Sequence, residues 1–202
     1  MTRPHSSLDL LLDCDGVLLD WVGGFIGFAS KALGREPDPA GPDSFDLTGW
    51  MGCDTATYFA MVNDFNEGAD GSFGRLTPLP GSVDALQAAA SQGRKISIIT
   101  ACSTLPRVIA QREQNLRDVY GDIFHEIHAV DLRQSKEELL RRYKDVFWVE
   151  DKSENAVLGA EIGHKSYLIR SSHNLADEAR LSHPRMTWVD GWGCIRSAEA
   201  LH

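Results

Sequence analysis

Apolar segments of two kinds alternate along most of the chain. Short runs rich in leucine, valine and isoleucine predict strands buried on both faces, and longer segments with helical spacing follow them. The predicted strands cover residues 8–14, 95–100, 125–130, 146–150, 165–169 and 186–189. Between them, helices are predicted over 82–92, 105–120, 135–144 and 155–161. This alternation predicts an α/β fold with a doubly wound parallel sheet covered by helices on both faces.

One segment departs from this alternation. A helix is predicted over 21–33, where Gly34 follows an apolar run. From residue 35 to about 80 the sequence is rich in proline, glycine and aromatic residues and has no long strand pattern. We therefore expect a small, mainly helical cap at 21–77, inserted after the first strand, and a core domain formed by 1–20 and 78–202.

The composition of the chain argues against some kinds of partner and some cellular locations. The chain has 202 residues, 43% of them hydrophobic, and a formal net charge of -9, which argues against binding a nucleic acid polymer. Its four cysteines form no C-x-x-C pair, which argues against a zinc site and fits a reducing cytoplasm. Neither a signal peptide nor a membrane span is expected, and the sequence leaves the oligomeric state open.

Two acidic residues lie at the end of the first predicted strand. Residues two apart in an extended segment project the same way, so Asp13 and Asp15 can face one pocket. Gly16 allows a sharp turn and close approach of a ligand. Repulsion between the two acids raises one pKa and separates their roles, so one acts as nucleophile and metal ligand and the other as general acid. A polar loop or an unrelated calcium site is the alternative.

Other polar residues follow later strands. Thr100 ends one strand, Lys136 opens a helix, and Glu150 and Asp151 end another strand. Each has a plain structural explanation: a β-branched strand residue, a surface charge, and a helix cap. Because ligands bind beyond the carboxyl ends of parallel strands, we expect these residues to meet in one site.

Grouped carboxylates predict a cation. Three of them without a positive partner would be costly, and Mg²⁺ fits best because it accepts carboxylates together with a phosphate oxygen. No histidine pair supports zinc. His125 and His128 lie in a predicted strand and are expected to be structural.

In this order the residues resemble the motifs of the haloacid dehalogenase superfamily. The matching segments are Asp13-Cys14-Asp15-Gly16-Val17, Thr100, Lys136 and Glu150-Asp151. The resemblance implies a phosphatase in which Asp13 forms an aspartyl-phosphate and Asp15 acts as acid and then base. It also implies that Thr100 and Lys136 orient the phosphoryl oxygens. Mg²⁺ would be held by the carboxylates of Asp13 and Asp151 and the backbone carbonyl of Asp15, with Glu150 holding a metal-bound water.

A narrower resemblance points to the 5'(3')-deoxyribonucleotidases. Residues 13–25, 78–81, the pair His173-Asn174 and residues 188–192 are similar to segments of that family. Ala101 stands where the family often has serine, Glu150 where it usually has aspartate, and Lys136 lies further from the final acids. These departures concern the substrate and leave the wider resemblance to the superfamily unchanged.

Aromatic residues of the insertion are candidates for contacting the substrate. Trp21, Phe25, Trp50 and Phe73 could offer a face for a nucleobase, with Trp21 the preferred one, or they could form the core of the cap. Thr100, Ala101 and Lys136 are expected at the phosphate end.

We therefore expect a Mg²⁺-dependent phosphatase acting on a small phosphate monoester, a nucleoside monophosphate in particular. A sugar phosphate, phosphotransfer, haloacid dehalogenation (against which Asp15 argues) and a catalytically inactive binding module are the alternatives.

Overall fold

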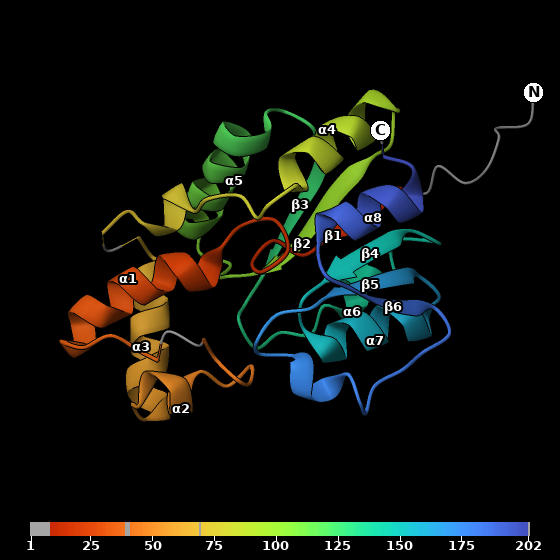
Figure 1. Ribbon diagram of the computed structural model, residues 1–202. Coiled ribbons are helices and arrows are strands. Elements are labelled where there is room, and N and C mark those ends of the chain that lie inside the picture. Colours follow the sequence, from red (N-terminus) through yellow and green to blue (C-terminus); the bar gives the residue numbers. More distant parts are fainter. Residues whose placement is uncertain (1–8, 39–40, 69, 202) are drawn as a thin grey trace, which may run out of the picture.

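Six parallel strands form the centre of the protein. The computed structural model describes residues 9–38, 41–68 and 70–201, so residues 1–8, which include the first residue of the first predicted strand, lie outside the described part. The sheet has the order β3-β2-β1-β4-β5-β6 (Figure 1). The strands are β1 (Leu10–Leu12), β2 (Ile96–Ala101), β3 (Phe124–Val130), β4 (Phe147–Glu150), β5 (Lys165–Ile169) and β6 (Met186–Val189).

The central strand is short and fully buried. Leu12 pairs with Ile98 of β2 on one side and with Val149 of β4 on the other. Leu10 and Leu12 pack into one apolar cluster, whereas Leu11 packs into another on the opposite face. The continuous apolar run of β1 therefore reflects a strand covered on both faces.

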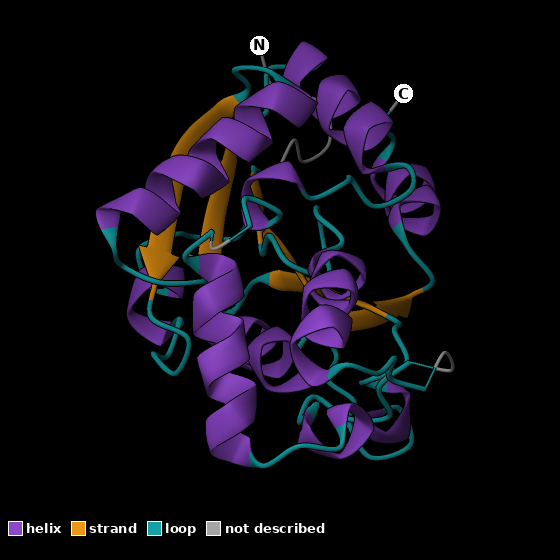
Figure 2. Ribbon diagram, turned by 90° about the vertical axis from the view of Figure 1, so that its left-hand side faces the viewer, coloured by secondary structure: helices purple, strands orange, loops and turns teal. Residues whose placement is uncertain are grey.

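Helices cover both faces of the sheet, as the alternating pattern predicted. The helices are α4 (Ser82–Ser91), α5 (Pro106–Tyr120), α6 (Glu137–Leu140), α7 (Ser153–Ile162) and α8 (Trp192–Glu199). Side chains of α4, α5 and α8 pack in the cluster that holds Leu10 and Leu12, and those of α6 and α7 pack in the cluster of Leu11. Figure 2 shows the helices gathered around the strands. The sequence did not predict α8, and α6 is shorter than the predicted helix over 135–144.

The segment between β1 and β2 is helical. It holds α1 (Trp21–Leu33), α2 (Thr48–Met51), α3 (Thr55–Asn66) and the 3₁₀ helix η1 (Phe73–Arg75), and its α-helices lie to one side of the sheet (Figure 1). Asp20 caps α1 by accepting a hydrogen bond from the backbone N–H of Gly23, and Gly34 ends it at a φ of 66°. These elements fall within the predicted insertion at 21–77, and its role as a separate cap stays a prediction.

In the part of the chain that the structure describes, no helix combines the length and apolar character needed to cross a membrane.

Candidate active site

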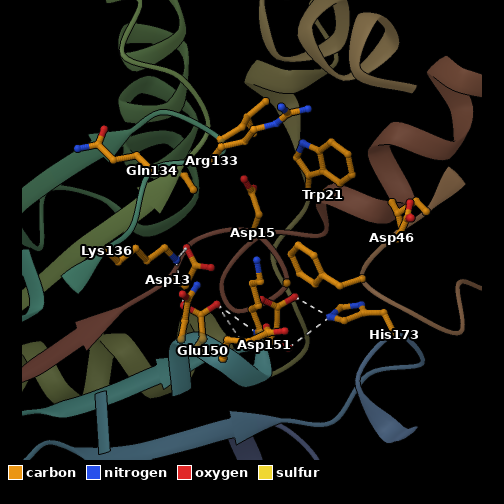
Figure 3. Close-up of a pocket in the computed structure, with 18 of the residues that line it drawn as sticks. Asp13, Asp15, Trp21, Asp46, Arg133, Gln134, Lys136, Glu150, Asp151 and His173 are labelled. Carbon is orange, nitrogen blue, oxygen red and sulfur yellow. Dashed lines mark hydrogen bonds and ion pairs between the residues drawn. The ribbon is translucent and has the colours of Figure 1, made fainter. Parts of the chain in front are cut away.

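Three carboxylates meet where β1 and β4 end. Asp13 follows β1, Glu150 is the last residue of β4, and Asp151 comes directly after it. Each offers an oxygen within 4.8 Å of the others, and all three residues are buried (Figure 3). Because β1 and β4 are hydrogen-bonded neighbours, the sheet brings together acids that are far apart in the sequence.

Lys136 supplies the positive charge beside these acids. Its Nζ lies 2.8 Å from Oδ1 of Asp13 and 2.9 Å from Oε2 of Glu150, and the side chain is only 2% exposed. Burial by itself would lower the pKa of Lys136, but Asp13 and Glu150 raise that pKa above its ordinary value. The lysine therefore stays charged at the position that precedes α6.

Glu150 ties the lysine to the loop after β4. Its Oε2 accepts hydrogen bonds from Lys136 and from Nδ2 of Asn155, while Oε1 accepts from the backbone N–H groups of Asp151 and Lys152. Burial raises the pKa of Glu150 well above its usual range, and Asp13 adds to the effect. With four donors around it, Glu150 is placed to hold its neighbours in position.

Asp151 is held by the segment that follows β5. Nε2 of His173 lies 3.1 Å from Oδ2 of Asp151, and Nδ2 of Asn174 donates to the backbone carbonyl of Asp151 at 2.7 Å. Burial lowers the pKa of His173, but its hydrogen bond to Asp151 and the charge of that residue outweigh burial and raise it. The pair that was singled out from the sequence thus packs against the acidic group.

Gly16 lies against the same carboxylate. Its φ of 75° is in the left-handed region, which favours glycine. A Cβ atom at this position would collide with the Asp151 side chain. Because Gly16 has no side chain, the turn after β1 can lie closer to the acids than it could with any other residue at this position.

Asp15 is paired with a buried arginine that the sequence analysis did not identify. Nη2 of Arg112, from α5, lies 2.6 Å from Oδ1 and 2.8 Å from Oδ2 of Asp15. Burial raises the pKa of Asp15 to about 6, while Arg112 opposes the shift and Asp13 adds to it. Arg112 lies at a buried position of α5. A charged residue among the apolar positions of the predicted helix is the feature of the sequence that could have identified it.

These side chains border one large cavity. It measures about 1030 Å³ and is lined by Asp13, Asp15, Lys136, Glu150 and Asp151 at the strand ends. Trp21, Tyr58 and Phe59 line it from the helical insertion, and Figure 3 shows Asp15 and Trp21 on the same side of the acids. The acids and the insertion therefore enclose a common space in which a small molecule fits.

The four candidate aromatics divide into two groups. Trp21 lines the cavity, with its ring stacked on Phe25 at 4.6 Å and its Nε1 donating to Oδ1 of Asn66. Phe25 and Phe73 are fully buried and do not line the cavity, which agrees with the alternative that they form part of the core. Trp50 does not line it either, and its Nε1 donates to the carbonyl of Asp38.

Thr100 and Ala101, at the end of β2, differ in their position relative to the cavity. Thr100 is fully buried, does not line the cavity, and its hydroxyl has no hydrogen-bond partner among the described residues. Ala101, the next residue, does line it. The structure therefore brings the residue after the threonine, and not the threonine hydroxyl, to the cavity wall. His128 lies elsewhere, with Nε2 at 2.8 Å from the hydroxyl of Tyr143.

The acidic group has the donor chemistry of a divalent-cation site. Asp13, Glu150 and Asp151 offer only carboxylate oxygens, which suit Mg²⁺. Lys136 balances one of their charges, so a cation would meet a site that still carries net negative charge. The residues present fit such an ion.

Comparison with known proteins gives a clear result for the fold. No protein-family model matches the chain, and no curated protein matches it. Solved structures match it over nearly its full length. One is a haloacid dehalogenase-like hydrolase from Streptococcus pneumoniae, with a TM-score of 0.63, 15% identity, and 95% of this chain and 98% of that chain covered. The chain has the haloacid dehalogenase-like fold.

Two further structures with this fold carry informative names. A haloacid dehalogenase family hydrolase from Deinococcus radiodurans R1, with bound phosphate and sodium, matches at a TM-score of 0.62 and 16% identity, covering 95% of this chain and 94% of that one. A D,D-heptose 1,7-bisphosphate phosphatase from Burkholderia thailandensis matches at 0.55 and 14%, covering 95% and 97%. The narrower likeness to deoxyribonucleotidases stays a prediction.

Proposed function

We propose that this protein is a phosphatase that hydrolyses a small phosphate monoester through an aspartyl-phosphate on Asp13. The observation that carries the proposal is the contact of Asp13 with Lys136 beside Glu150 and Asp151, at the floor of a cavity large enough for a small substrate. The likeness in fold to a hydrolase structure with bound phosphate agrees with it.

In the first step, a carboxylate oxygen of Asp13 forms a bond to phosphorus as the bond to the leaving oxygen breaks. The carboxyl proton of Asp15 passes to that oxygen, which departs as an alcohol. Lys136 stabilises negative charge on the phosphoryl oxygens. In the second step, water attacks phosphorus, Asp15 accepts a proton from it, and the Asp13–phosphorus bond breaks to release phosphate.

Asp13 and Asp151 would hold Mg²⁺, with Glu150 close by. The ion, when bound, neutralises charge on the phosphoryl group and orients it. Glu150 keeps Lys136 and the backbone of Asp151 in place through its four hydrogen bonds. His173 and Asn174 orient Asp151 from the other side.

For the substrate we favour a nucleoside monophosphate, from which the nucleoside is the leaving group. The Trp21 ring lines the cavity and is fixed by Phe25 and Asn66, so it offers a rigid flat surface for a base. A stacked base contributes roughly 1–3 kcal/mol to binding. A sugar phosphate is the second candidate, because Asp46, Thr55 and Gln134 add polar groups to the cavity wall that could bind hydroxyls.

The test is a screen of phosphate esters with and without Mg²⁺, measuring released phosphate. Nucleoside 5'- and 3'-monophosphates, sugar phosphates and p-nitrophenyl phosphate are compared, with Asp13→Asn as the control. We expect Mg²⁺-dependent hydrolysis by the native protein and none by Asp13→Asn. Turnover retained in the variant would reject Asp13 as nucleophile, and equal rates on nucleotides and sugar phosphates would reject the nucleotide preference. Absence of turnover on every ester would favour a binding module.

A further inference from the structure

Arg112 occupies a position where a charge is costly. Along α5 the buried side chains Val108, Arg112, Leu116 and Tyr120 recur every four residues and form a buried face of the helix, on which the other three are apolar cluster residues. Arg112 is only 1% exposed. A buried charge costs several kcal/mol unless a partner and hydrogen bonds compensate it. Its presence in this apolar stripe therefore calls for an explanation from its contacts.

The hydrogen bonds of Arg112 are directed at one residue. Nη2 donates to both oxygens of Asp15, at 2.6 and 2.8 Å. Within residues 9–38, 41–68 and 70–201, Nε and Nη1 have no hydrogen-bond partner. On its flat side the guanidinium lies over the Phe73 ring, with Cζ 4.2 Å from the ring centre. A packing role alone would not need a guanidinium here.

Arg112 reaches Asp15 from outside the cavity. Asp15 lines the cavity, whereas Arg112 and Phe73 do not. Figure 3 shows the Asp15 side chain standing apart from the group of Asp13, Glu150 and Asp151, on the side where the insertion closes the cavity. The arginine thus sits behind the carboxyl group and cannot touch a substrate. Any influence on a reaction must pass through Asp15.

We propose that Arg112 is a positioning residue, which fixes the Asp15 carboxyl group toward the leaving oxygen of the substrate, with Phe73 as the platform that fixes Arg112. The proposal rests on the proposed phosphatase function. In the first step the proton moves from the Asp15 carboxyl to the leaving oxygen as the phosphorus–oxygen bond breaks, and the Asp13–phosphorus bond forms. This transfer demands a defined distance and direction, which a free aspartate rotamer does not guarantee.

The leaving group separates this role from a structural one. Alkyl phosphates need a proton on the departing oxygen, whereas p-nitrophenolate leaves without one. The measured quantity is kcat/KM, which reports the steps up to departure of the alcohol or phenol. For Arg112→Met we expect kcat/KM on the best alkyl phosphate of the screen to fall at least about tenfold more than on p-nitrophenyl phosphate, as general acid catalysis contributes about 10²–10⁴-fold. Arg112→Lys keeps a positive charge. Its ratio of kcat/KM on the alkyl phosphate to kcat/KM on p-nitrophenyl phosphate should lie between those of Arg112→Met and the native protein.

Two controls make the result specific. Arg94→Met removes another arginine, whose Nη2 donates to the carbonyl of Glu199 in α8, away from the cavity lining, and should leave the ratio unchanged. In an Asp15→Asn background, adding Arg112→Met should change the ratio no further, because Arg112 acts only through the carboxyl group. If Arg112→Met does not fold, Phe73→Leu replaces it, with a smaller shift of the ratio in the same direction.

The possible outcomes are distinct. A native protein that hydrolyses neither ester would overturn the proposed function. A native protein that hydrolyses both, with a ratio unaltered by Arg112→Met or Phe73→Leu, would overturn the positioning role and leave the function standing. A further loss in the Asp15→Asn background would also overturn it, because Arg112 would then act by another route.

Discussion

Nζ of Lys136 lies 2.8 Å from Oδ1 of Asp13, the same oxygen that accepts the backbone N–H of Cys14 at 2.7 Å. Two donors thus fix the orientation of one carboxylate that is only 7% exposed. If Asp13 is the nucleophile, as we propose, it would need little rearrangement before it reacts. In the proposed mechanism Lys136 would then serve both the charge balance of the acids and the phosphoryl transfer.

Replacing Lys136 with methionine should abolish most activity and lower stability. Removal of one electrostatic donor from an active site costs about 10²–10³-fold in rate. Breaking a buried ion pair costs about 3–5 kcal/mol. Phosphate release and the melting temperature measure the two effects. Lys165→Met, which breaks the Lys165–Glu199 pair elsewhere, should lower stability alone. Native rates in Lys136→Met would contradict its assigned role.

Gly16→Ala should disable the acidic group without unfolding the protein. The added methyl would meet the Asp151 carboxylate and force it aside, and the positive φ adds strain. We expect loss of Mg²⁺ binding in calorimetric titration together with loss of phosphate release. Gly27→Ala is the matched control, because a Cβ there meets no atom within 4 Å. Alanine should stabilise α1 by up to about 1 kcal/mol relative to glycine. Equal Mg²⁺ affinity in both variants would argue against Asp151 as a ligand.

His173→Gln should weaken the affinity for Mg²⁺ about 10–100-fold, the usual effect of losing a side chain that orients a metal ligand. The reason is its contact with Oδ2 of Asp151 at 3.1 Å. Titration with Mg²⁺ measures the change. His128→Gln, whose ring contacts Tyr143 instead, serves as the control and should bind the ion normally.

The dependence of the reaction on pH should report the protonation of Asp15. Because its pKa is raised to about 6, the carboxyl carries its proton below that pH and loses it above. The ratio of kcat/KM for an alkyl phosphate to that for p-nitrophenyl phosphate should therefore fall as the pH rises through about 6. Taking the ratio cancels the ionisation of enzyme groups that affect both substrates alike, and each rate is first corrected for the ionisation of its own substrate. A ratio that rises or stays flat over this range would exclude Asp15 as the acid.

Trp21→Leu should raise KM for nucleoside monophosphates about tenfold, because a stacked base contributes roughly 1–3 kcal/mol. The KM for p-nitrophenyl phosphate should change less, since it lacks a base, and Trp50→Leu should change neither because Trp50 does not line the cavity. An unchanged nucleotide KM in Trp21→Leu would shift the proposal toward sugar phosphates.

Much of the fold could be predicted because it follows from local patterns of apolar and polar residues. The apolar runs that became β1, β2 and β4 need burial on both faces, so their identity as strands of a parallel sheet follows from the sequence. The convergence of Asp13, Lys136 and Asp151 follows in turn from strand ends meeting at one edge. Helix α8 was missed because its buried residues Trp192, Ile195 and Glu199 mix apolar and charged types over a short span.

What could not be predicted depends on side-chain partners. The sequence favoured Trp21 as the aromatic at the substrate and left Phe25 and Phe73 open between a substrate contact and the core of the insertion. The packing of α1, α3 and η1 buries these two. Thr100 is the second-last residue of β2, which runs one residue further than predicted, and its hydroxyl lies in the interior. Arg112 is one cation among many until α5 brings it to Asp15.

The adjacency of β1 and β4 has a consequence for how the protein matures. The first acids are synthesised early and the last ones late, so a nascent chain that ends within α5 carries Asp13 and Asp15 but lacks Lys136, Glu150 and Asp151. The group of three carboxylates forms only when the two strands pair. An ion that binds the folded protein but not the incomplete chain would stabilise only the complete protein against unfolding.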